Sequence, residues 1–377
     1  MGEKEIIDRW ISRLRIFARK HTILSVVLAT ITFIFLLSCI LLYANVLLYD
    51  YQHLGVAASG IGNTASVTGT FIHYDTNWFL RIAQYGYRSL NDYAFLPLYP
   101  LAIRFFKATT GMSYNWSAII FSWLALCAAS VMLYKWFDFE IKKLGKNISP
   151  WMPMGLLAIF PTSMYLAMPY TDGLFMLLNV SAIYLYRKEK YLLASILGGL
   201  ASATRYQGVL LFVLFASDFY LSRPRDYKKL LPAIGACAGL VGYMIFLKID
   251  TGSATHFITA EKEWGRAGGN LLINLLKSFR PIELWFLIVA GAGLRLMWRH
   301  IEKPFFIYSL AYILLPLSSG TFTGFNRYLF NLAPLFLVFA IANKKDISRP
   351  IRTVYILSSA LLAGWFMLFF ANNYLVG

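Results

Sequence analysis

Charged side chains are scarce in this sequence. Asp, Glu, Lys and Arg make up only 14% of its 377 residues, whereas soluble domains carry roughly 25%. This scarcity argues against a water-soluble globular domain. Hydrophobic residues instead reach 58%, and apolar runs of about 20 residues have the length that crosses a bilayer as a helix. The composition therefore predicts an all-α polytopic membrane protein.

Cysteine is also rare. Cys39, Cys127 and Cys237 are the three cysteines of the chain, and each lies inside an apolar run. We interpret them as packing residues and predict no disulfide framework. The sequence also lacks an Asp-x-Asp motif and any cluster with the spacing of a metal site. It indicates no cofactor and no metal ligands, although it leaves a divalent metal open.

Negative charge is the scarcer sign. Against 18 Asp and Glu residues the chain has 35 Lys and Arg residues, a net charge of +17. Such an excess can indicate nucleic-acid binding. Here, however, the basic residues cluster in short loops between apolar segments, as the positive-inside rule describes. We therefore predict membrane lipid as a partner and no nucleic acid.

The apolar segments number about eleven. Every second loop between them carries at least three Lys or Arg residues, which places those loops and the N-terminus in the cytoplasm. The protein is then integral to the membrane, and the cell membrane is expected if the source is prokaryotic. The predicted spans are 23–48, 114–136, 151–168, 172–187, 191–206, 207–222, 230–250, 283–298, 304–319, 328–343 and 353–371.

No internal repeat or low-complexity linker divides the chain. We predict a basic, amphipathic, cytosolic segment over 1–22 and a single transmembrane domain over 23–377. Two extracytoplasmic segments, 49–113 and 251–282, are longer than ordinary loops, which favours a functional role. The first is rich in aromatic residues, so disorder is not expected.

One carboxylate, Asp75, lies in the first outer segment, within HYDTNWFLRIAQYGY. A carboxylate can act as general base on a hydroxyl group. Arg205 lies in the apolar stretch LGGLASATRYQGVLLF, where an ionisable side chain needs a partner and can bind a phosphate with two hydrogen bonds. Two structural interpretations stay open: Asp75 could cap the helix after it, and Arg205 could pair with Asp172.

A carboxylate and several arginines at a membrane face suit the transfer of a sugar from a lipid-linked phosphate to a hydroxyl group. Phosphate leaves readily, so a second carboxylic acid is not required, unlike in glycoside hydrolysis. A transporter or flippase of a lipid-linked or anionic solute is the alternative. A membrane subunit that keeps the fold without the chemistry is a third interpretation.

The run YDTNWFLRIAQYGY, followed by YAFLPLYPLAIRFF, resembles the GPI mannosyltransferase 2 (PIG-V) family of membrane glycosyltransferases. Four further stretches resemble the family in the same order: PYTDGLF, SATRYQGVL, FITAEKEWGR and FNRYLFNLAPLF. Tyr74 stands where the family usually has Trp, and Asp172 stands where eukaryotic members commonly have Glu. The short chain looks like a prokaryotic relative.

The resemblance implies a GT-C fold with outer-face loops and amphipathic helices. It implies an inverting transfer of a sugar, typically mannose, from a polyprenyl-phosphate donor to a lipid or glycan acceptor. On this reading Asp75 is the base, and Arg205, Arg327 and, more weakly, Arg266 bind the donor phosphate. The residues expected to orient the sugar or acceptor are His73, Asn77, Trp78, Asp172, Gln207 and Trp264.

Overall fold

A computed structural model describes residues 21–48, 68–264 and 271–371, and in these ranges the chain is helical with no strand. The predicted all-α polytopic membrane fold is confirmed. Five described helices are long and apolar enough to cross a membrane. They are α2 (Thr22–Leu48), α5 (Tyr114–Lys143), α10 (Leu230–Thr251), α13 (Pro281–His300) and α17 (Arg349–Ala371).

The other predicted spans are shorter helices, and two of them are broken. The segment 151–168 is α6 followed by a separate 3-10 turn, and the segment 328–343 is divided between α15 and α16. Pro161 and Pro334 lie at these breaks; proline cannot donate a backbone hydrogen bond and ends or begins a helix. The shorter helices are α6 (Trp151–Ala158), η3 (Ser163–Leu166), α7 (Thr171–Arg187), α8 (Tyr191–Thr204), η4 (Tyr206–Val209), α9 (Leu210–Leu221), η5 (Tyr227–Lys229), α12 (Leu271–Ser278), α14 (Lys303–Leu317), α15 (Phe325–Phe330) and α16 (Ala333–Ile341).

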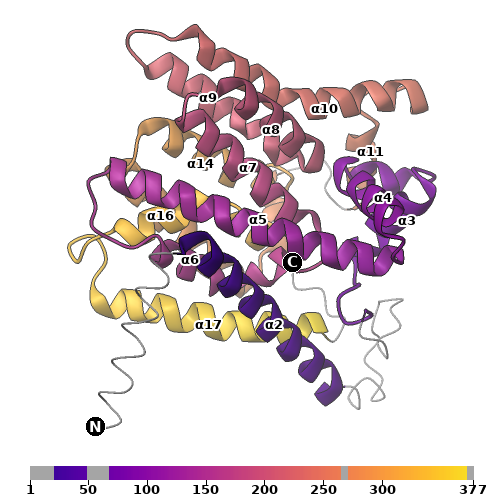
Figure 1. The fold of residues 1–377 in the computed structure, drawn as a ribbon, viewed down its shortest axis with the longest axis horizontal. Helices are drawn as coiled ribbons and strands as arrows, with labels where there is room; N and C mark the ends of the chain where they lie inside the picture. The colour runs from indigo at the N-terminus through magenta and orange to yellow at the C-terminus, as the bar shows by residue number, and fades with distance from the viewer. Residues whose placement is uncertain (1–20, 49–67, 265–270, 372–377) are drawn as a thin grey trace.

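The helices form one bundle, in which α5 packs against α2 and α7, and α17 packs against α2. At one end of the bundle, to the right in Figure 1, lie α3 (Asp75–Tyr85), α4 (Leu98–Thr110) and α11 (His256–Glu263). The 3-10 turn η2 (Leu90–Ala94) packs against α11. These elements come from the two long segments that the sequence predicts to be extracytoplasmic.

The tightest helix contact joins α8 and α10, because both helices present small residues there. A Cβ atom at Gly239 would lie only 2.0 Å from the carbonyl oxygen of Gly199. The Gly239 amide also donates to Ser202 Oγ at 3.1 Å. Small residues allow such close approach of two backbones within a membrane. This contact holds the end of α8, and therefore Arg205, at a defined position.

Ion pairs gather several basic loops at the other end of the bundle. Glu302, between α13 and α14, pairs with Lys143 at the end of α5 and with Arg187 at the end of α7. His300 contacts Asp346 in the loop between α16 and α17, at 2.9 Å. These loops, which are rich in Lys and Arg in the sequence, therefore lie at the same end of the structure. That this end faces the cytoplasm stays a prediction.

Candidate active site

Asp75 is the first residue of α3, and its carboxylate is directed to another helix. Oδ2 accepts a hydrogen bond from Arg327 Nη1 at 2.8 Å, and the side chain is 33% exposed. No side-chain cap hydrogen bond forms at this helix start. Tyr74, not Asp75, is therefore the N-cap residue, but as an acid in the first turn Asp75 interacts favourably with the helix dipole, as the capping interpretation expects.

The backbone before Asp75 is strained and tied to the turn before α7. Tyr74 has φ +46° and ψ −113°, a conformation that costs energy for any residue other than glycine. The hydroxyl group of Thr76 donates to the Pro169 carbonyl at 3.2 Å, and the Tyr170 hydroxyl donates to the His73 carbonyl at 3.0 Å. These bonds hold the strained segment, and with it the direction of the Asp75 side chain.

Arg327, on α15, bridges two carboxylates. Besides Asp75, its guanidinium group binds Asp172 Oδ2, through Nη2 at 3.0 Å. The Arg327 Cζ atom lies 4.5 Å and 4.7 Å from the ring centres of Tyr165 and Tyr170, where cation–π attraction stabilises its charge. The buried Nε atom has no hydrogen-bond partner among the described residues. A buried donor of this kind usually has a partner.

Asp172 is the buried centre of the cluster. Its side chain is 0% exposed and lies in the first turn of α7. It pairs with Arg205 Nη1 and Arg327 Nη2, and Asn331 Nδ2 donates to its Oδ1 at 2.8 Å. The prediction that Arg205 could pair with Asp172 is confirmed. Because a buried carboxylate needs such partners, Asp172 holds both arginines in place.

Arg205 lies at the break between α8 and α9, beside the start of α7. Its Nη1 atom donates to Thr171 Oγ1 at 3.2 Å, and its Nε atom donates to Gln207 Oε1 at 3.4 Å. No hydrogen bond from Nη2 to a described residue is present. The turn requires glycine at Gly208, because a Cβ atom there would lie 2.4 Å from the backbone of Ala201.

An aromatic cluster lies beside this charged cluster, on the next turn of α3. Trp78 packs edge-to-face on Trp264, with ring centres 5.3 Å apart, and stacks on Phe95 at 5.9 Å. The guanidinium carbon of Arg81 lies 4.1 Å from the Trp78 ring centre, and Arg81 also pairs with the buried Asp92. Trp264 is 41% exposed. The cluster therefore presents indole surface that a ligand can reach.

The structure brings part of the predicted site together. Asp75, Asp172, Arg205 and Arg327 form one connected network, with Gln207 bonded to Arg205. Positive charge in this network comes from its two arginines. Within the described residues, no group of three or more His, Cys, Asp or Glu side chains is arranged to hold a metal ion.

The remaining predicted residues are placed differently. Trp78 and Trp264 contact each other but lie outside the ion-pair network, and the Asn77 side chain is exposed. His73 is buried, with Nε2 3.0 Å from the Thr70 carbonyl. Arg266 lies outside the described residues, as do residues 1–20 of the predicted segment 1–22 and residues 49–67 of the predicted segment 49–113.

The structure adds three residues to the candidate active site for which the sequence predicts no role. Asn331 is the third partner of Asp172, and its spacing of four residues from Arg327 in FNRYLFN is the sequence signal for it. Tyr165 and Tyr170 flank the Arg327 guanidinium. Tyr170 belongs to the family-like stretch PYTDGLF, which is its sequence signal, whereas Tyr165 is one of many tyrosines and has no distinguishing signal.

These features define the class: a polytopic helical membrane protein with a carboxylate–arginine cluster at one end of its bundle. The model of the family described as "Mannosyltransferase (PIG-V)" matches residues 14–220, more than half of the chain, so the protein belongs to that family. The resemblance found in the sequence is thereby confirmed. The match includes Asp75, Asp172 and Arg205, and Arg327 lies beyond it.

A curated relative is similar over part of its length. It is "GPI mannosyltransferase 2" of Aspergillus fumigatus, 28% identical over 174 residues. The matched stretch covers 41% of this chain and 34% of the relative, so this chain spans about a third of the relative's length in the comparison.

Proposed function

We propose that the protein is a membrane mannosyltransferase that moves mannose from a polyprenyl-phosphate donor to a hydroxyl group of a lipid or glycan acceptor. Family membership supports the reaction type. One observation carries the site: Asp75 is accessible, yet Arg327 links it to the buried Asp172–Arg205 pair. A base and two cationic groups therefore lie in one connected network.

Asp75 is the proposed general base. Arg327 holds its Oδ2 atom, while no hydrogen bond from a described residue reaches Oδ1. Oδ1 takes the proton of the acceptor hydroxyl as the acceptor oxygen bonds to the anomeric carbon of the sugar. The bond from that carbon to the phosphate oxygen breaks, and its electron pair leaves with the phosphate. A single displacement of this kind inverts the anomeric centre.

Arg327 and Arg205 are the proposed phosphate ligands. Arg327 Nε and Arg205 Nη2 are donors without a partner among the described residues, and the departing phosphate gains negative charge. Donors that are already oriented stabilise such charge most effectively. Asp172 is a positioning residue that orients both guanidinium groups. Arg266 stays a proposed further ligand of the phosphate.

The aromatic cluster and its neighbours are the proposed sugar and acceptor side of the site. Indole rings stack on sugars, and Trp78 and Trp264 present such surface next to α3. We propose that the loop around Trp264 closes over the donor and excludes water. Asn77, Gln207 and His73 stay candidates for orienting the sugar or the acceptor.

We place the site on the extracytoplasmic face. Asp172 is the second residue of α7 and Arg187 is the last, so the two residues lie about 22 Å apart at a rise of 1.5 Å per residue. Arg187 shares its end of the bundle with the basic loops, which the positive-inside rule assigns to the cytoplasm. The Asp75 cluster then belongs to the opposite face.

The test is sugar transfer by the purified protein in liposomes. Labelled polyprenyl-phosphate mannose is the donor, and a membrane lipid extract supplies acceptors. We expect the wild type to transfer mannose and Asp75→Asn to lose about 100- to 10,000-fold in turnover, the usual contribution of a general base. Donor binding should persist, because the amide keeps the shape of the side chain.

Asp250→Asn is the matched control. Asp250 is an exposed carboxylate at the same end of the bundle, bonded to the Tyr93 hydroxyl, and its amide variant should transfer mannose like the wild type. Turnover by Asp75→Asn equal to that of Asp250→Asn would refute Asp75 as the base. Uptake of labelled lipid without any transfer by the wild type would favour the transporter alternative instead.

A further inference from the structure

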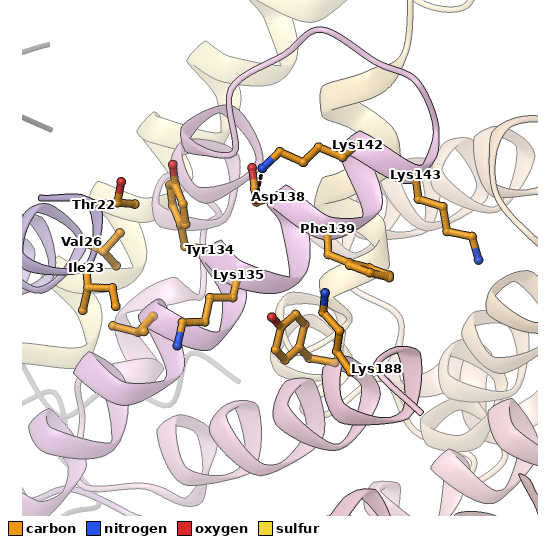
Figure 2. A pocket seen from close by; sticks show the side chains of 12 residues that line it. Thr22, Ile23, Val26, Tyr134, Lys135, Asp138, Phe139, Lys142, Lys143 and Lys188 are labelled. Carbon is orange, nitrogen blue, oxygen red and sulfur yellow. Dashed lines mark hydrogen bonds and ion pairs between the residues drawn. The ribbon is translucent and has the colours of Figure 1, made fainter. Parts of the chain in front are cut away.

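A pocket of about 530 Å³ lies between the start of α2, the second half of α5 and the end of α7. Figure 2 shows Thr22, Ile23 and Val26 of α2 on one side, residues of α5 in the middle and Lys188 on the other side. Four lysines line the pocket, together with one acid. They are Lys135, Lys142, Lys143 and Lys188, and the acid is Asp138.

Two of these lysines are already neutralised by a carboxylate. Lys142 pairs with Asp138 at 2.7 Å. Lys143 pairs with Glu302 at 2.8 Å, and in Figure 2 its side chain extends away from the α2 side of the pocket. These pairs leave the positive charge of the pocket to its other two lysines.

Lys135 and Lys188 have no carboxylate partner within the described parts of the chain. Lys135 is exposed and makes no described ion pair. Lys188 Nζ lies 4.4 Å from the ring centre of Phe139, a contact that positions the ammonium group but leaves its charge uncompensated. The pocket therefore offers two positive charges, from α5 and α7, to an anion.

The other wall of the pocket is apolar. Ile23, Val26 and Val131 line it, and Ile23 is about half exposed, while Leu28 on another face of α2 is also about half exposed. Exposed apolar residues on a membrane-spanning helix face lipid. The pocket thus combines a cationic part with an apolar part beside the exposed apolar side chains of α2, which matches a molecule with an anionic head and a hydrocarbon chain.

The pocket is separate from the candidate active site. Lys188 follows the last residue of α7, whereas Asp172 lies in its first turn, so about 24 Å of helix lie between them. That distance approaches the thickness of the hydrocarbon core of a bilayer. The pocket lies at the end with the basic loops, where basic pockets between membrane helices bind acidic lipid headgroups.

We propose that this pocket binds the phosphate headgroup of an anionic phospholipid, with Lys135 and Lys188 on the phosphate and an acyl chain along α2. The site goes beyond sugar transfer, and it does not depend on the proposed mechanism. A lipid bound here joins α2, α5 and α7 at the end opposite the Asp75 cluster.

Native mass spectrometry of the full-length protein in detergent tests the proposal. The probes are dioleoyl phosphatidylglycerol and, as a neutral lipid, dioleoyl phosphatidylcholine. We expect phosphatidylglycerol to bind more tightly, and the Lys135→Gln/Lys188→Gln double variant to lose about tenfold or more in affinity for it, as expected for two lysines near an anionic lipid. Equal binding of the two lipids to the wild type would overturn the proposal.

The matched control is Lys344→Gln/Lys345→Gln. These two lysines are exposed in the loop before α17 and line no described pocket, so the same charge is removed at the same end of the molecule. Wild-type affinity in this control is expected. An equal loss of affinity in both double variants would show general surface attraction and overturn the pocket assignment.

Two measurements on the unaltered protein complete the test. Phosphatidylglycerol should protect Lys135 and Lys188 from acetylation, but not Lys344 and Lys345. The absence of selective protection would refute the site even if the double variant were poorly folded. Inorganic phosphate should not displace the lipid, because the acyl chain adds apolar contact; full displacement at equal concentration would indicate a soluble phosphate ligand instead.

Discussion

Helix α7 carries an arginine–carboxylate cluster at each end, and the two clusters differ in how completely the arginine is used. At the end of α7, Arg187 binds Glu140 through Nε at 2.7 Å and Nη2 at 2.9 Å. The same guanidinium binds Glu302 through Nη1 at 2.7 Å and Nη2 at 3.2 Å. Every nitrogen of Arg187 therefore donates to a carboxylate.

At the start of α7, Arg327 also bridges two carboxylates, but with one hydrogen bond to each. Its bonds go to Asp75 and Asp172, and its Nε donor has no partner among the described residues. Asp75 is one-third exposed, whereas Glu140 is almost fully buried. In the Arg187 cluster every guanidinium nitrogen donates to a carboxylate, and we infer that this cluster stabilises the fold. In the Arg327 cluster one donor has no partner among the described residues, and we infer that it serves a ligand.

The largest effect that separates the two clusters is expected in catalysis. Lysine keeps the charge of arginine but loses its planar, two-pronged geometry. We expect Arg327→Lys to lower kcat/KM for sugar transfer by about 100- to 1,000-fold, the usual cost of one transition-state donor. Arg187→Lys should leave kcat/KM for sugar transfer unchanged per folded molecule. Equal losses in the two variants would contradict the division of roles.

An effect of comparable size in free energy is expected in stability, where the Arg187 cluster should be the more sensitive of the two. Arg187→Met leaves Glu140 buried without its main partner, and breaking a buried pair costs about 3–5 kcal/mol of unfolding free energy. Lys143→Gln, which removes a half-exposed partner of Glu302, should cost at most about 1 kcal/mol. Unfolding in mixed micelles with increasing SDS measures both. A loss for Lys143→Gln as large as that for Arg187→Met would contradict the prediction.

The smallest effect is a pH dependence at the Arg187 cluster. Burial alone would raise the pKa of Glu302, but hydrogen bonds from Arg187 and Lys143 outweigh it and lower this pKa from 4.5 to about 2. The folded state therefore holds Glu302 ionised, and its contribution to stability is complete above pH 4.5 and is lost as the pH falls towards 2.

Thermal unfolding at pH 6 and pH 3.5 checks this dependence. The midpoint temperature of the wild type should fall more from pH 6 to pH 3.5 than that of Glu302→Gln, because the amide cannot titrate. An identical fall in both proteins would assign the acid sensitivity to other carboxylates.

Much of the fold could be predicted from the sequence because a bilayer sets the length of apolar segments. All eleven predicted spans contain helix in the structure. The α5 helix continues beyond its predicted end at 136 to Lys143, since the polar Glu140 finds a buried partner in Arg187. Hydropathy cannot foresee such a partner, because it scores each residue alone.

The site could be predicted residue by residue but not as an arrangement. Asp75, Arg205 and Arg327 are conspicuous because ions are costly near lipid. The sequence suggests the pair of Arg205 with Asp172, but the two pairs made by Arg327 are not visible in it: Arg327 lies 252 residues from Asp75 and 155 residues from Asp172. Nothing local indicates that Asp172 binds both arginines.

The sequence by itself determined the helical membrane architecture, the gathering of basic loops at one end and the identity of the ionic residues at the other. Composition and charge act locally, so they can be read along the chain. Only the tertiary structure decided which arginine is saturated and which keeps free donors. That difference depends on how many carboxylate oxygens the packed helices bring within hydrogen-bonding distance of each guanidinium group.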